Sequence, residues 1–116
     1  MEHDRADSLP ALQRMRITIA RIKVHIQGRS MEQFLADKVL CDAVLMQLSV
    51  LGEEVRRVDP DLLNKYDYPW HKVRAQRNVI VHDYFGIRLP SIWANVQQDL
   101  GPLDELLERI IQNEFS

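Results

Sequence analysis

The sequence has few residues that break or cross-link a chain. Its 116 residues include 1 cysteine, 4 glycines and 5 prolines. One cysteine cannot form an internal disulfide, and Cys41 lies within an apolar run, which is typical of a buried, inert thiol. Since glycine and proline supply most turn signals, their scarcity predicts long regular elements.

The sequence also lacks the marks of membrane, exported and nucleic-acid-coating proteins. No apolar run approaches the ~20 residues of a membrane-spanning helix, and the polar start MEHDRADSLP does not resemble a signal peptide. The formal net charge of -2 argues against a protein that covers nucleic acid through its overall charge. We therefore expect a cytoplasmic protein, in which any nucleic-acid site must be a local basic one.

What the sequence does contain is helical periodicity. Residues 1–116 suffice for a single domain with one core. Apolar residues recur in steps of three and four from Leu12 to Ile26, and Gly28 ends this first helix. Ser30 and Gln33 have the spacing of a capping box, which opens a second helix from Met31 to about Val58. No stretch with a period of two is long enough to predict a strand.

The second predicted helix is apolar on more than one face. One row consists of Phe34, Cys41, Leu48 and Val55, and another of Val39, Met46 and Val50. Such a wide apolar surface indicates a central helix, or a helix that also meets another subunit. Gly52 would allow another helix to cross this one closely. Glu53-Glu54 beside Arg56-Arg57 is interpreted as a solvated face with local ion pairs.

The remaining elements follow from proline and glycine positions. Asp59-Pro60 predicts a cap and a short helix over residues 61–64, and Asp67-Tyr68-Pro69 predicts a helix from Pro69 to about His82. The last apolar pattern stays in phase through Gly101-Pro102, which favours one kinked helix over two independent ones. The predicted fold is an all-α, antiparallel four-helix up-and-down bundle with a short extra helix.

The candidate chemistry lies in RNVIVHDY, residues 77–84. A histidine can move the protons in RNA cleavage by the 2′-hydroxyl, and an arginine can bind the phosphate and its transition state without a metal. Arg77 and His82 lie ~140° apart around a regular helix. They would converge only if the helix ended near Val81 or if two copies met across a dimer axis.

From the residues alone, a structural interpretation competes with this one. His82 can be a cation at a helix C-terminus, Arg77 a surface charge and Tyr84 a packed aromatic. The other histidines, His3, His25 and His71, do not have the spacing of a zinc site.

The run from Arg77 to Gly86 resembles the signature of the HEPN superfamily, in which an arginine, four residues, a histidine, one residue and a tyrosine follow one another. More closely, the chain is similar to the HepT toxins. This similarity includes Tyr68-Pro69-Trp70, Leu51-Gly52-Glu53 and Ile92-Trp93, and it extends from about Leu12 to Ile111. Ala75-Gln76 and Arg88 depart from the usual pattern without removing a residue of the signature.

The resemblance implies a homodimeric, metal-independent endoribonuclease without a cofactor, which acts as a toxin and has a small nucleotidyltransferase (MNT) antitoxin as its partner. It implies that Arg77 and His82 are catalytic, that Asn78 supports them and that the antitoxin adds AMP to Tyr84. On a continuous helix Tyr84 would share the face of Arg77, so that the AMP would block the cationic site. Further candidates for RNA contact are His71, Lys72 and Arg74.

Two other hypotheses remain open. The chain can be a non-catalytic binding module that docks a nucleotidyltransferase, or a helical dimerisation domain in which the signature is structural. RNA cleavage by the parent but not by His82→Ala would separate the ribonuclease from both.

Overall fold

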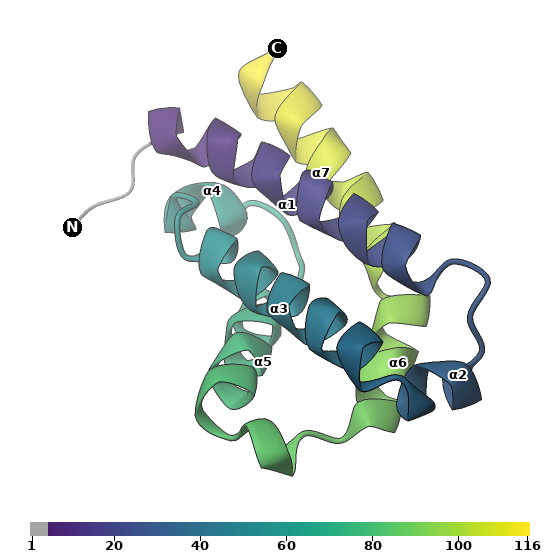
Figure 1. Cartoon of the computed structure of the whole chain (residues 1–116). Coiled ribbons are helices and arrows are strands. Elements are labelled where there is room, and N and C mark those ends of the chain that lie inside the picture. The colour runs from purple at the N-terminus through teal and green to yellow at the C-terminus, as the bar shows by residue number, and fades with distance from the viewer. Residues whose placement is uncertain (1–4) are drawn as a thin grey trace.

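The computed structural model describes residues 5–116, and all regular elements in these residues are helical (Figure 1). They are α1 (Arg5–Ile26), α2 (Met31–Ala36), α3 (Lys38–Val55), α4 (Pro60–Leu63), α5 (Trp70–His82), the 3-10 turn η1 (Tyr84–Gly86), α6 (Leu89–Gln98) and α7 (Leu100–Phe115). The predicted all-α class is confirmed. His3 lies outside the described residues.

Most of the core comes from α1, α3 and α7, and α2, α4, α5 and α6 add further buried residues to the same cluster. α1 packs against α3 and α7, α3 packs against α5, and α6 contacts α2 and α7. The first apolar row of α3 is buried, as predicted, and Phe34 in α2 packs against Trp93 with ring centroids 5.2 Å apart. The up-and-down order of a four-helix bundle remains a prediction.

The second predicted helix is in fact two helices. The capping box is confirmed, since the Gln33 N–H donates to Ser30 Oγ over 3.1 Å and the Ser30 N–H donates to Gln33 Oε1 over 2.9 Å. The chain then turns at Asp37, whose backbone is extended and whose carboxylate accepts the Leu40 N–H over 3.0 Å. Asp37 therefore caps a new helix, and an aspartate inside an apolar pattern was the overlooked cap signal.

The last predicted helix is also divided, at Asp99. α6 ends at Gln98 and α7 begins at Leu100, and the Leu103 N–H donates to Asp99 O over 3.1 Å. Pro102 lacks the N–H that would continue the hydrogen bonds of α6 into α7, so the break lies just before it. The prediction of one kinked helix is therefore wrong, since α6 and α7 are separate elements.

The short connections mostly agree with the sequence. Asp59 accepts the Asp61 N–H over 3.0 Å and caps α4, as predicted. Asp67-Tyr68-Pro69 does not repeat the aspartate cap of α4, because Pro69 directly precedes α5 and no side chain caps this helix. Gly28 has a φ of 72°, a conformation that glycine adopts most readily, and α1 ends before it. No helix among residues 5–116 is long and apolar enough to cross a membrane.

Candidate functional site

α5, which carries the signature, crosses α3 very closely at Gly52. A Cβ on Gly52 would lie 2.4 Å from Arg77 Cβ and 2.9 Å from Val73 O. Only a glycine therefore lets the backbones approach this far, as the sequence predicted for this residue. The start of α5 is fixed by Trp70, which is buried and donates from Nε1 to Leu63 O over 3.2 Å. Packing of α5 on α3 thus determines the position of the Arg77 backbone and Cβ.

Arg77 is oriented by two polar neighbours. Its Nε lies 3.4 Å from Glu53 Oε2, and its Nη1 donates to Asn78 Oδ1 over 3.1 Å. Glu53 Oε2 is buried and accepts no hydrogen bond from the described residues, although Arg56 Nη1 also lies 3.5 Å away. Arg77 is thus held mainly by charge. The supporting role expected of Asn78 corresponds here to its contact with Arg77.

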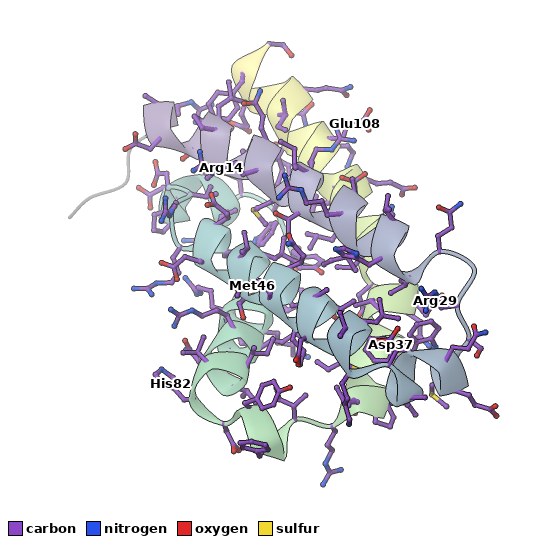
Figure 2. The ribbon with its side chains drawn as sticks, viewed as in Figure 1. Arg14, Arg29, Asp37, Met46, His82 and Glu108 are labelled. Carbon is purple, nitrogen blue, oxygen red and sulfur yellow. The ribbon has the colours of Figure 1, made fainter. Side chains whose placement is uncertain are left out.

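His82 is the last residue of α5, and its side chain is exposed. Figure 2 shows it at the outer edge of the molecule, with its side chain turned away from the body. Since α5 stays helical through His82, Arg77 and His82 remain on different faces of one helix. α5 ends one residue after Val81, so both residues still belong to the same regular helix.

Tyr84 lies beyond α5 and contacts α3 instead. It opens η1, and its hydroxyl donates a hydrogen bond to Asp42 Oδ1. This bond to the Asp42 carboxylate raises the pKa of the Tyr84 hydroxyl above its ordinary value. The expectation that Tyr84 continues the face of Arg77 is wrong, because the helix ends two residues earlier. The tyrosine ring remains half-exposed.

The three candidate RNA contacts at the start of α5 are all exposed but do not form one cluster. His71 and Arg74 are three residues apart and share a helix face. Lys72 instead lines a cavity between α5 and the junction of α6 with α7. The signature and these cations therefore occupy several sides of the same helix.

The two adjacent glutamates of α3 form the predicted local ion pairs, with Arg56 at 3.5 Å from Glu53 and Arg57 at 3.9 Å from Glu54, but they are not a solvated face. Glu54 is buried, and its Oε2 accepts from Arg14 Nε over 2.8 Å, while Glu53 pairs with Arg77. Glu53 and Asp42 are eleven residues apart, which is close to three helical turns, so they share the side of α3 that α5 and η1 cover. Carboxylates at this spacing in an otherwise apolar helix were a signal for partners of Arg77 and Tyr84.

Neither the single thiol nor any metal-ligating cluster of residues 5–116 makes a second catalytic centre. Cys41 is buried and donates to Phe34 O over 3.0 Å, as expected for an inert thiol. Among residues 5–116, no group of three or more His, Cys, Asp and Glu side chains is arranged to hold a metal ion.

Comparison with known proteins gives a consistent family. The family described as "Ribonuclease HepT-like" matches residues 15–110. A protein of Caldanaerobacter subterraneus subsp. tengcongensis named "Putative RNase" is 30% identical over 104 residues, which cover 89% of each chain. One of Methanocaldococcus jannaschii with the same description is 34% identical over 68% of this chain and 69% of its own. The "Probable ribonuclease HepT" of Thermococcus cleftensis is 29% identical over 68% and 73%, respectively. No solved structure matches the chain.

Proposed function

Since the chain belongs to the HepT-like ribonuclease family, we propose that it is a metal-independent endoribonuclease and the toxin of a toxin–antitoxin pair. The observation that carries this proposal is the intact signature on α5, with its arginine fixed at the α3 crossing and its histidine exposed to solvent. A fixed cation and an accessible proton carrier are the two groups that cleavage by a 2′-hydroxyl needs.

In the proposed reaction, His82 accepts the proton of the 2′-hydroxyl while water protonates the leaving 5′-oxygen, or water accepts the first proton and His82 donates the second. The 2′-oxygen forms a bond to phosphorus, and the bond between phosphorus and the 5′-oxygen breaks. The guanidinium of Arg77 binds the phosphate oxygens and stabilises the charge that increases in the transition state. Because Glu53 contacts Arg77 mainly through charge, the planar fork of Arg77 can turn to a phosphate.

The separation of Arg77 and His82 on α5 favours a site made by two copies. Exposed apolar side chains lie on α5 at Val79 and Val81 and on α3 at Val39 and Met46. Figure 2 shows Met46 on the open face of α3. We propose that these surfaces pack in a homodimer, so that the Arg77 of one copy meets the His82 of the other.

The proposed regulation is addition of AMP to the Tyr84 hydroxyl by a nucleotidyltransferase antitoxin. The half-exposed ring and the position two residues after His82 support this site. An AMP group there would lie beside the end of α5. Its attachment would replace the hydroxyl proton, so Tyr84 could no longer donate its hydrogen bond to Asp42.

The test is cleavage of a mixed tRNA and mRNA pool by the purified protein in excess EDTA, next to His82→Ala. We expect the parent to cut the pool and the variant to be inactive. Since His82 is exposed, its loss should change the free energy of unfolding by less than about 0.5 kcal/mol. The matched control is His25→Ala on α1, which should still cleave.

The competing proposal is a binding module that docks a nucleotidyltransferase without cleaving RNA. The observation in its favour is that one chain keeps Arg77 and His82 on different faces of α5. A parent protein that is dimeric, unmodified at Tyr84 and inactive on the RNA pool would put this second function first.

A further inference from the structure

A cavity of about 360 Å³ lies between α5 and the junction of α6 and α7. Its apolar wall includes Leu51, Leu100 and Leu103, which are buried. Its volume is in the range of about 300 to 1,000 Å³ that small-molecule sites occupy. Neither Arg77 nor His82 lines it, so the proposed cleavage does not account for its residues.

The polar wall of the cavity is a chain of hydrogen bonds centred on Asn95. Gln76 Nε2 donates to Asn95 Oδ1 over 3.4 Å, and Asn95 Nδ2 donates to Asp99 Oδ2 over 2.8 Å. The Asp99 backbone N–H also donates to Asn95 O over 2.9 Å. The backbone of Asp99 and its carboxylate are therefore each held by one bond to Asn95, and the remaining lone pairs of the carboxylate are acceptors for a ligand.

The cavity also contains a flat ring and a cation. Tyr68 packs against Trp70 with ring centroids 4.7 Å apart, which fixes the plane of the phenol. Burial, and then the charge of Asp99, raise the pKa of Tyr68, so its hydroxyl stays protonated. Lys72 supplies an ammonium group at the same cavity. An apolar wall, one ring, one carboxylate and one cation suit a planar heterocycle with a polar edge.

We propose that this cavity binds a guanine base of single-stranded RNA. The Watson–Crick edge of guanine has two adjacent donors, N1–H and the N2 amino group, which match the two oxygens of the Asp99 carboxylate. Its third group, the O6 acceptor, requires a donor such as the Lys72 ammonium. RNA-binding proteins commonly stack unpaired bases on aromatic rings and read this edge by hydrogen bonds.

The other three bases fit the polar wall less well. Adenine and cytosine each have an amino donor beside a ring-nitrogen acceptor, and this acceptor would face an oxygen of Asp99. Uracil has one N–H between two carbonyl oxygens. Each of these three bases therefore places one of its acceptors against an oxygen of the Asp99 carboxylate. Two acceptors without a proton between them weaken binding once water is displaced.

This inference rests on the proposed function and extends it to a base preference. The cavity residue Gln76 directly precedes Arg77, so RNA that reaches Arg77 would pass the mouth of the cavity. Guanine recognition would then select which phosphates arrive at the cleavage site.

The direct test is titration of the isotope-labelled protein with GMP, AMP, CMP and UMP, followed by NMR. We expect GMP to shift the side-chain amide signals of Gln76 and Asn95 and to bind at least about tenfold more tightly than AMP. Asp99→Asn keeps the shape but replaces one acceptor by a donor, so it should abolish the preference for GMP. Asp61→Asn, an exposed change in α4, is the matched control and should keep it. Lys72→Gln, at an exposed residue, should weaken GMP binding without changing the fold.

Sequencing the ends of cleaved RNA separates this inference from the nuclease proposal. We expect the parent to cut next to guanine and Asp99→Asn to cut the same pool without that preference. Cleavage that ignores guanine, or equal binding of all four nucleotides, would overturn the guanine site while the ribonuclease stands. GMP binding at these amides by a protein that cuts no RNA would support the cavity and contradict the nuclease.

Discussion

The two ends of α5 are held by different forces. At its start, Trp70 is buried and bonded to Leu63 O, and farther along the helix Arg77 lies against Gly52 in a crossing too close for any Cβ. Beyond its end, Phe85 is 97% exposed, and the hydroxyl of Tyr84 is attached to α3 by one hydrogen bond to Asp42. One helix thus joins a buried, closely packed region to a solvent-exposed region with few contacts.

The difference matches what each end has to do in the proposed reaction. A phosphate-binding arginine works only from a fixed position, and close packing at Gly52 supplies that position together with the contacts to Glu53 and Asn78. A proton carrier must be accessible to RNA, and a tyrosine that another protein modifies must be accessible to that protein. Both therefore lie in a region with few packing contacts, where local opening requires little free energy. Stability and access are therefore divided along one element.

The largest expected effect compares the two aromatic residues at these ends. Trp70→Ala removes a buried ring and its hydrogen bond, so it should lower the free energy of unfolding by about 3–5 kcal/mol. Phe85→Ala should change it by less than about 0.5 kcal/mol, because the ring is almost fully exposed. Urea unfolding of both variants beside the parent provides the values.

A large loss of stability in Phe85→Ala would contradict the view that, in one chain, the region after α5 has few packing contacts. If the loss of stability grows with protein concentration, a second copy covers the ring, and the exposed end of α5 is part of an interface. If it does not change with concentration, the ring is packed within its own chain and the division is wrong.

A smaller effect is expected at the crossing itself. Gly52→Ala places a methyl group 2.4 Å from Arg77 Cβ, so α5 must move away from α3. We expect a loss of about 1–3 kcal/mol of stability, as for other overpacked sites. Gly101→Ala is the matched control, since its Cβ would meet no atom within 4 Å. That change should stabilise the protein by about 0.5–1 kcal/mol, the usual gain for replacing glycine in a helix. Equal effects of the two substitutions would show that the crossing is not tight.

Much of the packed region could be predicted from the sequence. Apolar rows with helical spacing identified the buried side of α3, and one glycine in that helix indicated a close crossing. Both are local signals, because burial repeats along a helix and only glycine tolerates such contact. The end of α5 at His82 was predicted as well, from the chain break that Gly86 makes shortly afterwards.

The polar contacts of the site could not be predicted in the same way. The partner of Tyr84 is Asp42, forty-two residues away, and no periodicity connects a side chain after α5 to the middle of α3. Glu54 looked like a surface charge because its sequence neighbours are charged, yet it is buried against Arg14 of α1. Pairing between elements depends on tertiary packing. In the sequence, only the spacing of Asp42 and Glu53 indicates that these carboxylates face the same neighbouring element.

The smallest expected effect concerns the contact that holds Tyr84. Because the bond to Asp42 raises the pKa of Tyr84, the folded state keeps this proton more tightly than the unfolded chain does. The contribution to stability is present below the unfolded pKa, near 10, and is lost as the pH rises through the folded pKa. Asp42→Asn should lower the pKa of Tyr84 toward its ordinary value, because an amide carries no charge. The absorbance of tyrosinate, with Tyr84→Phe subtracted, follows this residue alone. An unchanged titration would mean that Asp42 does not hold the ring, and that the end of α5 is freer than the hydrogen bond indicates.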